Sequence, residues 1–155
     1  ELLKMSQAQK VGHHVTLIST QGNRRGDDGA LPSHQITESL LGLRNKYPHF
    51  RAFRNYLGLM DSFLDESGMP ECRAGHQSFN IDHLGNVAPC IEKIGTPVGS
   101  ILETPLSELL TQLKVQNQAQ GCQDCWTLCR GMSQLMGDGG SWSSWQDFTG
   151  RMRAS

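Results

Sequence analysis

Residues 72–90 read CRAGHQSFNIDHLGNVAPC, and residues 121–131 read GCQDCWTLCRG. These two stretches hold all five cysteines of the 155-residue chain, at positions 72, 90, 122, 125 and 129. Cys72 and Cys90 stand at the two ends of a predicted hairpin, and Cys122 and Cys125 form a Cys-x-x-Cys pair. This spacing is typical of one tetrahedral metal centre that is held by two segments far apart in the sequence.

The composition excludes several classes of protein. A formal net charge of -1 indicates neither a nucleic-acid-binding field nor an acidic tail. No apolar run reaches the length of a membrane span, and the first residues, ELLK, lack the order of a signal peptide. Because the cysteines are clustered and odd in number, the sequence favours a metal in a reducing compartment over a disulfide framework. We therefore expect a cytoplasmic protein without nucleic-acid or membrane partners.

Residues 1–66 have the order helix, strand, loop, helix, helix. A weak helical pattern over 1–11 is expected to end at Gly12, and β-branched residues predict a strand over 13–19. Helices are predicted from Ser33 to before Pro48 and over 50–64. The second helix has an apolar stripe at steps of three and four, which predicts a packing face: Phe50, Phe53, Leu57, Met60 and Leu64.

This order is that of an α/β protein with a parallel sheet, and one strand cannot form a sheet. The chain also begins without methionine, inside a predicted helix. We therefore expect residues 1–66 to be the last elements of a barrel or open sheet, and the sequence to be part of a longer protein.

From Cys72 onward the pattern changes to a small α+β unit. Strands are predicted over 78–82 and 87–91, joined by a turn at 83–86. Thr104 and Pro105 begin a helix that is expected to end near Gln116, followed by a polar approach to Cys122. In the tail we expect a Gly/Ser loop and a short terminal helix, with three aromatic residues that pack back on the body: Trp142, Trp145 and Phe148.

The thiolates suit more than one metal. Cysteine sulfur selects zinc, iron–sulfur clusters and Cu(I), and four cysteines suit zinc or a cluster equally by count. Structural zinc sites commonly use two Cys-x-x-Cys pairs, whereas Cys72 and Cys90 are separated by seventeen residues. The spacing therefore favours a cluster and leaves zinc open.

The segment resembles a known family. Cys72, Gly85 and Cys90, with the flanking Gly85-Asn86-Val87 and Pro89-Cys90, are similar to the opening motif of the SPASM and twitch domains of radical S-adenosylmethionine (radical SAM) enzymes. Further similar features are Gly99-Ser100-Ile101-Leu102 and the Cys122–Cys125 pair. The resemblance covers about residues 70–131 and implies a hairpin, a helix and an auxiliary 4Fe–4S cluster. Residues 1–66 would be the end of a partial TIM barrel with its linker helix, and 132–155 a Gly/Ser/Trp-rich tail.

The cysteine count departs from the full family pattern. A full SPASM domain has seven cysteines and two auxiliary clusters, whereas this chain has five cysteines. The shorter twitch version holds one cluster, and its ligands map onto Cys72, Cys90, Cys122 and Cys125. Three residues, not five, separate Cys125 from Cys129, so Cys129 is a candidate additional metal ligand or a neighbour of the cluster.

The motif Cys-x-x-x-Cys-x-x-Cys, which binds the cluster that cleaves S-adenosylmethionine in this family, is absent. We expect it upstream of Glu1, so the chain alone is not expected to be catalytically competent, and its catalytic residues are unknown. The resemblance implies that the intact enzyme uses S-adenosylmethionine, a second 4Fe–4S cluster and an external electron donor or acceptor. It would make a 5′-deoxyadenosyl radical and modify a peptide, protein or small molecule, while the auxiliary cluster transfers an electron or anchors the substrate.

Two other interpretations stay open. The chain can be a non-catalytic zinc- or cluster-binding structural module, or a domain stapled by disulfides. His76 and His83 are near the cysteines but are expected to be polar surface residues. Arg73 and Arg130 adjoin cysteines, and each can raise the potential of a cluster or simply be solvated. The charged segment 24–28 is expected to be a solvated loop.

Overall fold

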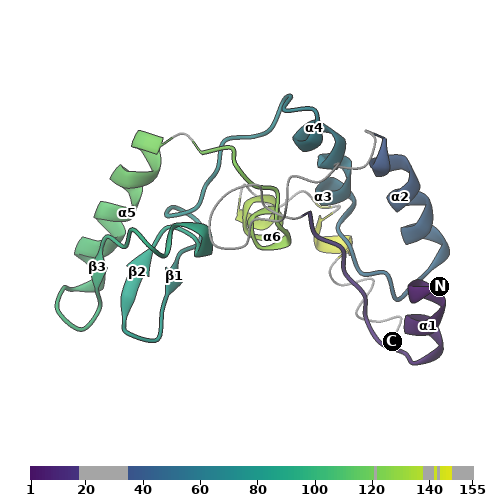
Figure 1. The fold of residues 1–155 in the computed structure, drawn as a ribbon, viewed down its shortest axis with the longest axis horizontal. Coiled ribbons are helices and arrows are strands. Elements are labelled where there is room, and N and C mark those ends of the chain that lie inside the picture. Colours follow the sequence, from purple (N-terminus) through teal and green to yellow (C-terminus); the bar gives the residue numbers. More distant parts are fainter. Residues whose placement is uncertain (18–34, 121, 138–141, 143, 148–155) are drawn as a thin grey trace. The chain divides into compact units, whose positions relative to one another are not determined.

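The computed structural model describes residues 1–17, 35–120, 122–137, 142 and 144–147 (Figure 1). These residues form two compact units. Unit 1 contains the described residues of 1–17, 35–69 and 126–147, and unit 2 contains those of 70–125. Together they have an α+β composition, with helices in both units and one small antiparallel sheet in unit 2.

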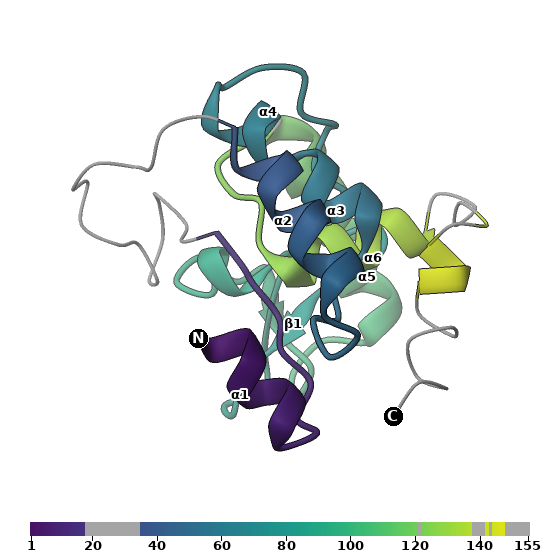
Figure 2. The same cartoon turned by 90° about the vertical axis from the view of Figure 1, so that its right-hand side faces the viewer.

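Unit 1 is built from helices around an aromatic core. Its helices are α1 (Leu2–Ala8), α2 (Ile36–Lys46), α3 (Arg54–Gly58), α4 (Met60–Leu64) and α6 (Leu128–Gly137). Helix α3 packs against both α2 and α6, as the turned view in Figure 2 also shows. The predicted apolar stripe is confirmed as a packing face, since all five of its side chains are buried: Phe50, Phe53, Leu57, Met60 and Leu64.

The single helix predicted over 50–64 is wrong, because the chain forms two short helices that break at Leu59. In a continuous helix the amide of Asp61 would donate to the carbonyl of Leu57. Here the hydroxyl of Thr37 lies between the two groups: it donates to Leu57 O at 3.1 Å and accepts from Asp61 N at 3.3 Å. A side chain inserted into the helical ladder is a known cause of a break.

The carboxylate of Asp61 in turn begins α2. Its Oδ1 accepts from the amides of Gln35 and Ile36 at 3.0 and 2.8 Å, which satisfies two donors that a helix start leaves open. These hydrogen bonds hold the pKa of Asp61 below its usual value, despite the opposing effect of burial. The predicted start at Pro32 and Ser33 lies outside the described residues, and the cap comes from a residue 25 positions away.

The N-terminal elements also differ from the prediction. Helix α1 ends at Ala8, and the left-handed residue is Lys10 (φ 54°) rather than Gly12. Within the described part of 13–19 the predicted strand is reduced to one parallel bridge between His13 and Phe50. The amide of His13 donates to His49 O at 2.8 Å, and Arg51 N donates to His13 O at 2.8 Å. The regular elements that the structure describes in unit 1 are otherwise helices, so the partial barrel stays a prediction.

Unit 2 is a three-stranded antiparallel sheet with one long helix. The strands are β1 (Asn80–Ile81), β2 (Asn86–Ala88) and β3 (Gly99–Ser100), in the order β1-β2-β3. A 3-10 turn, η2 (Ile91–Lys93), follows β2, and α5 (Leu106–Gln120) follows β3. Val87 of the sheet packs with Leu109 and Leu113 of α5 in a small buried core. The predicted hairpin is confirmed, although its strands are shorter than expected.

Two glycines allow this unit to close. Gly75 has a φ of +85°, and a Cβ at this position would lie 2.9 Å from the carbonyl oxygen of Leu113. Gly99 has a φ of +156°, and its Cβ would lie 2.8 Å from a methyl group of Leu109. Both positions therefore need glycine for the sheet side of the unit to approach α5.

Helix α5 continues to Gln120, so the predicted end near Gln116 is wrong. Residues 115–120 contain no glycine or proline, and glutamine is a good helix former. The stretch that was expected to be a polar approach to Cys122 thus continues the helix as far as Gln120. Among the described residues no helix is both long and apolar enough to cross a bilayer.

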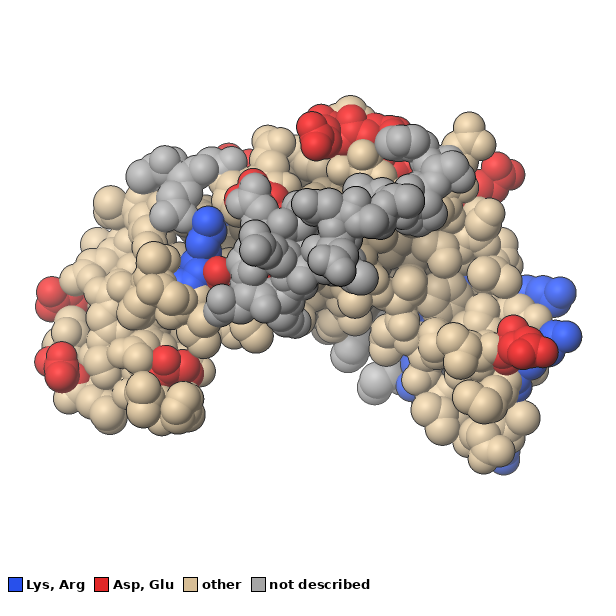
Figure 3. Space-filling view, viewed as in Figure 1, with Lys and Arg blue, Asp and Glu red and all other residues tan. Residues whose placement is uncertain are grey.

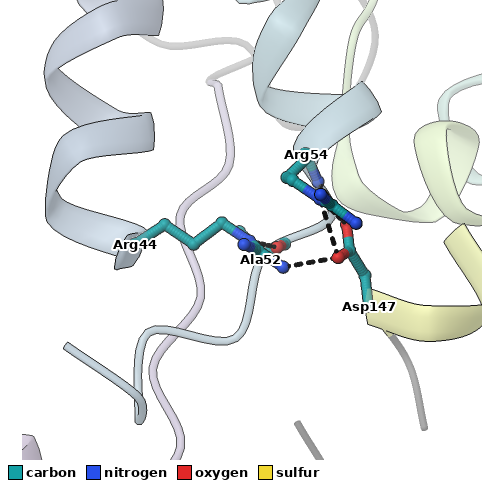
Figure 4. A network of polar contacts seen from close by, with 4 residues as sticks. All are labelled: Arg44, Ala52, Arg54 and Asp147. Atoms are coloured by element: carbon teal, nitrogen blue, oxygen red, sulfur yellow. Dashed lines mark hydrogen bonds and ion pairs between the residues drawn. The ribbon is translucent and has the colours of Figure 1, made fainter. Parts of the chain in front are cut away.

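The C-terminal segment is attached to unit 1 through a buried carboxylate. Asp147 lies 2.6 Å from Nη2 of Arg44 and 3.0 Å from Nε of Arg54, and Nε of Arg44 donates to Ala52 O at 2.6 Å (Figure 4). The expected aromatic packing is wrong for Trp142 and Trp145, which are 77% and 50% exposed. The helical turn at 144–147 buries Ser144 and Asp147 instead, and Phe148 lies outside the described residues.

Candidate metal centre

Four of the five cysteines lie in the same compact unit. Cys72, Cys90, Cys122 and Cys125 belong to unit 2, whereas Cys129 is an exposed residue of α6 in unit 1. In this structure all five are free cysteines. The four thiols of unit 2 come from three places in the chain: the loop before β1, the end of β2, and the segment after α5.

Cys72 is the most deeply buried of the four, at 6% exposure. Its carbonyl oxygen accepts a hydrogen bond of 2.9 Å from Nδ2 of Asn117, whose side chain on α5 is itself buried. The following loop turns back at Gly75, where the amide of Gly75 donates to Ser78 O at 2.6 Å. The backbone at Cys72 is thus fixed to α5 on one side and to the start of the hairpin on the other.

Cys90 follows the last residues of β2 and begins the turn η2, where Lys93 N donates to Cys90 O at 3.1 Å. Burial raises the pKa of the Cys90 thiol above its usual value, and the neighbouring Cys125 and Cys72 add to the increase. The amides of Glu92 and Lys93 oppose this effect. Cys90 is therefore within electrostatic range of Cys125 and Cys72.

Cys122 joins the same group. Burial raises its pKa to about 11, against an opposing hydrogen bond from the amide of Asp124. The Asp124 carboxylate, which accepts a hydrogen bond from Cys122 Sγ at 3.4 Å, and the Cys72 thiol raise it further. Without a metal the thiols of Cys90 and Cys122 therefore hold their protons at neutral pH. A bound cation would reverse this preference because the thiolate is the ligand.

The donor set of unit 2 fits an iron–sulfur cluster, since cysteine thiolates are the ligands of such clusters. In the part of the chain that the structure describes, no three His, Cys, Asp or Glu side chains form a group that would hold a single metal ion. The candidate ligands of a cluster are the four cysteines of unit 2: Cys72, Cys90, Cys122 and Cys125. Cys129, in unit 1, stays a candidate additional ligand.

The other residues considered near the cysteines have separate environments. His76, His83 and Arg73 are exposed. Arg130 is buried in unit 1, where its guanidinium lies 5.5 Å from the centre of the Trp126 ring and its Nε donates to Gln134 at 3.3 Å. The charged segment 24–28 lies outside the described residues.

The sequence analysis did not identify Asn117 or Asp124. A signal for Asn117 was present, because it continues the buried i, i+4 series of Leu109 and Leu113 on α5. A polar residue on an apolar stripe indicates a buried hydrogen bond. The role of Asp124 depends on the local turn between Cys122 and Cys125, which spacing alone does not fix.

The comparison with protein families supports the resemblance of this segment. The family model of the SPASM iron-sulfur cluster-binding domain matches residues 72–130. This segment is therefore similar to a SPASM domain, and the match covers less than half of the chain. The match begins at the first cysteine and covers all five, including Cys129 of α6. No curated protein and no solved structure was found to match the chain.

We predict that Asn117→Leu destabilises the SPASM segment by about 1–3 kcal/mol, because the buried Cys72 carbonyl loses its side-chain donor. Urea unfolding followed by far-ultraviolet circular dichroism measures the loss. Gln112→Leu is the matched control, since Gln112 is on the same helix and makes an exposed bond to Glu108. If both substitutions lowered the free energy of unfolding equally, the hydrogen bond to Cys72 would contribute no more than the exposed bond does.

A second prediction concerns the metal-free thiols. Cys90 and Cys122 should react with iodoacetamide more slowly than the exposed Cys129, and the rate at Cys122 should increase until the pH approaches about 11. The pKa of Cys122 is higher in the folded protein than in the unfolded chain, so the protonated thiol favours the folded state. This stabilisation is fully present at a pH below the pKa of the unfolded chain. It is lost as the pH rises through the pKa of the folded protein. Mass spectrometry of timed samples gives the rates, and in denaturant all five cysteines should react alike.

Proposed function

We propose that this chain is the C-terminal part of a radical SAM enzyme, and that Cys72, Cys90, Cys122 and Cys125 bind one auxiliary 4Fe–4S cluster of the twitch type. The observation that carries the proposal is the SPASM match over 72–130 together with the four thiols of unit 2. The raised pKa values of Cys90 and Cys122, which arise in part from the other thiols, support a shared site.

When bound, the cluster supplies one-electron chemistry or, with one iron site open, a point of attachment for the substrate. The residues of the chain would hold the cluster in place. Burial of Cys72 would limit the access of water to its sulfur, and the hydrogen bond from Asn117 fixes the backbone of Cys72. Two of the four ligands lie in the segment that follows α5, and the other two lie on either side of the hairpin. The position of the cluster would thus depend on the packing of α5 against the sheet.

The radical SAM enzyme of which this chain would be a part has further expected features. Residues 1–66 would be the last elements of its partial TIM barrel, an assignment that the parallel pairing of His13 with Phe50 supports, since barrel strands of that fold are parallel. S-adenosylmethionine and a second 4Fe–4S cluster would bind in the part of that enzyme that carries the Cys-x-x-x-Cys-x-x-Cys motif. The substrate would be a peptide, protein or small molecule, with an external electron donor or acceptor, in a cytoplasm that keeps thiols reduced.

The test is anaerobic reconstitution of the chain with iron and sulfide. The proposal requires about four irons and four sulfides per chain, with a broad thiolate-to-iron absorption band. Cys72→Ala and Cys125→Ala should each lose most of the iron and the band. One bound zinc without colour would overturn the proposal in favour of a structural zinc module.

Cys129→Ala is the matched control, because Cys129 lies in unit 1 and is exposed. It should keep the full iron and sulfide content. A loss as large as that of Cys72→Ala would make Cys129 a ligand and would contradict the four-ligand assignment.

A further inference from the structure

Two turns of unit 2 meet at one end of the sheet. The first is the β1–β2 turn at residues 82–85, and the second follows β3 at residues 101–103. Asn86, which begins β2, pairs with Ser100, which ends β3, and Ile101 N donates to Gly85 O at 2.9 Å. We call residues 81–86 and 99–108 the sheet tip. Cys90 follows the opposite end of β2, so the tip lies away from this candidate ligand.

The tip exposes an unusual amount of apolar surface. Leu102 is 79% exposed, Leu84 61% and Ile101 41%. A Cβ at Gly85 would lie 3.0 Å from Leu102 and 3.4 Å from Ile101, so these side chains cover the turn that carries Leu84. Ile81 and Leu106, at 47% and 45% exposure, extend the apolar surface on the adjoining strand and helix. Contiguous exposed apolar side chains are characteristic of binding surfaces.

Besides His83, the charged residues of this surface have one sign. Residues 81–86 and 99–108 contain Asp82, Glu103 and Glu108 and no lysine or arginine. Hydrogen bonds from the side chain and amide of Asn86 and from the amide of Leu84 lower the pKa of Asp82, against a small opposing effect of burial, and keep its carboxylate ionised. In Figure 3 the region of the two turns, at the lower left, shows acidic and uncharged atoms without basic ones.

We propose that the sheet tip is a docking surface for a cationic amphipathic segment of a partner protein, with apolar side chains on one face and lysine or arginine around them. Leu84, Ile101 and Leu102 would receive the apolar face, and the three carboxylates would select the basic rim by charge complementarity. Two other occupants are disfavoured by the same charges. A two-fold contact with a second copy would bring the carboxylates against themselves, and an anionic lipid surface would repel them.

The probe for this surface is a fluorescein-labelled, amidated peptide of lysine and leucine with the leucines on one helical face. Fluorescence anisotropy with the full chain measures its affinity at low and moderate salt. Leu84→Ser with Leu102→Ser should weaken binding at least tenfold. Glu103→Gln with Glu108→Gln should weaken it several-fold and reduce the dependence on salt. Val115→Ser, at a 63% exposed position on α5, is the matched control and should leave the affinity unchanged.

Circular dichroism confirms that each variant is folded. Absence of binding at millimolar peptide, or equal binding by the wild type and both tip variants, would overturn the proposal. Equal binding of a peptide with glutamate in place of lysine would also overturn it, because the carboxylates would then play no part in selection. Self-association of the chain that is abolished by Leu84→Ser with Leu102→Ser would assign the surface to a second copy instead. Tip-dependent binding to anionic vesicles would assign it to a membrane.

Discussion

Asp147→Ala is expected to lower the free energy of unfolding of unit 1 by about 3–5 kcal/mol, the range observed when one partner of a buried ion pair is removed. The side chains of Arg44 and Asp147 are only 7% and 6% exposed, and their closest atoms are 2.6 Å apart. Removal of the carboxylate takes a counter-charge away from the buried Arg44 guanidinium, which keeps its bond to Ala52 O. Urea unfolding followed by tryptophan fluorescence measures the loss.

Arg54→Ala is the control for this experiment, because Arg54 is 46% exposed and its pair with Asp147 is screened by water. It should cost less than about 1 kcal/mol. A loss of less than 1 kcal/mol in Asp147→Ala as well would contradict the view that the buried pair holds the C-terminal segment. Replacement of both partners, Arg44→Met with Asp147→Leu, should recover much of the loss, since no buried charge is then left uncompensated.

Gly131→Ala should destabilise unit 1 by about 3 kcal/mol, at the upper end of the usual cost of overpacking. A Cβ on Gly131 in α6 would lie 2.3 Å from Cδ2 of Tyr56. The ring cannot easily move aside. Tyr56 stacks on Trp126 at 5.6 Å between ring centres, Trp126 Nε1 donates to Tyr56 O at 2.9 Å, and Tyr56 Oη donates to Trp126 O at 3.3 Å.

Gly42→Ala is the same substitution in α2, at an exposed position with no atom within 4 Å of the new Cβ. It should stabilise the protein by about 0.5–1 kcal/mol, because alanine loses less backbone freedom in a helix than glycine does. Opposite signs for the two variants in thermal unfolding would confirm the steric explanation. A stabilising effect of Gly131→Ala would contradict it.

Patterns that depend on near neighbours were predictable. The stripe from Phe50 to Leu64 follows helical spacing, and all of its members are buried although the helix breaks. The break itself depends on Thr37, which is twenty residues before the Leu57 carbonyl that it contacts. Likewise, no local pattern in the tail indicates that Asp147 pairs with an arginine 103 residues earlier. These tertiary contacts overrode the local propensities.

For the candidate site, too, patterns among near neighbours were predictable and tertiary contacts were not. The identities and spacing of the cysteines were sufficient to predict the segment that matches the SPASM family. They were not sufficient to predict that Cys129 lies on a helix, α6, that begins at Leu128. The sequence interpretation expected a Gly/Ser loop in the tail and a short helix only at its end. The helix has a strongly apolar side against which Tyr56 packs, and its glycine and serine content obscured this pattern.

The distribution of the aromatic residues between the two units, with Tyr56 and Trp126 both in unit 1, has a consequence for optical spectroscopy. All three tryptophans and both tyrosines of the chain fall in unit 1, and Phe79 is the one phenylalanine, tyrosine or tryptophan of residues 70–125. Intrinsic ultraviolet fluorescence therefore reports on unit 1 alone. Acrylamide should quench Trp142 and Trp145 and spare the buried Trp126. Visible absorption from a reconstituted cluster would report on unit 2, so the melting of the two units can be recorded in one cuvette at separate wavelengths.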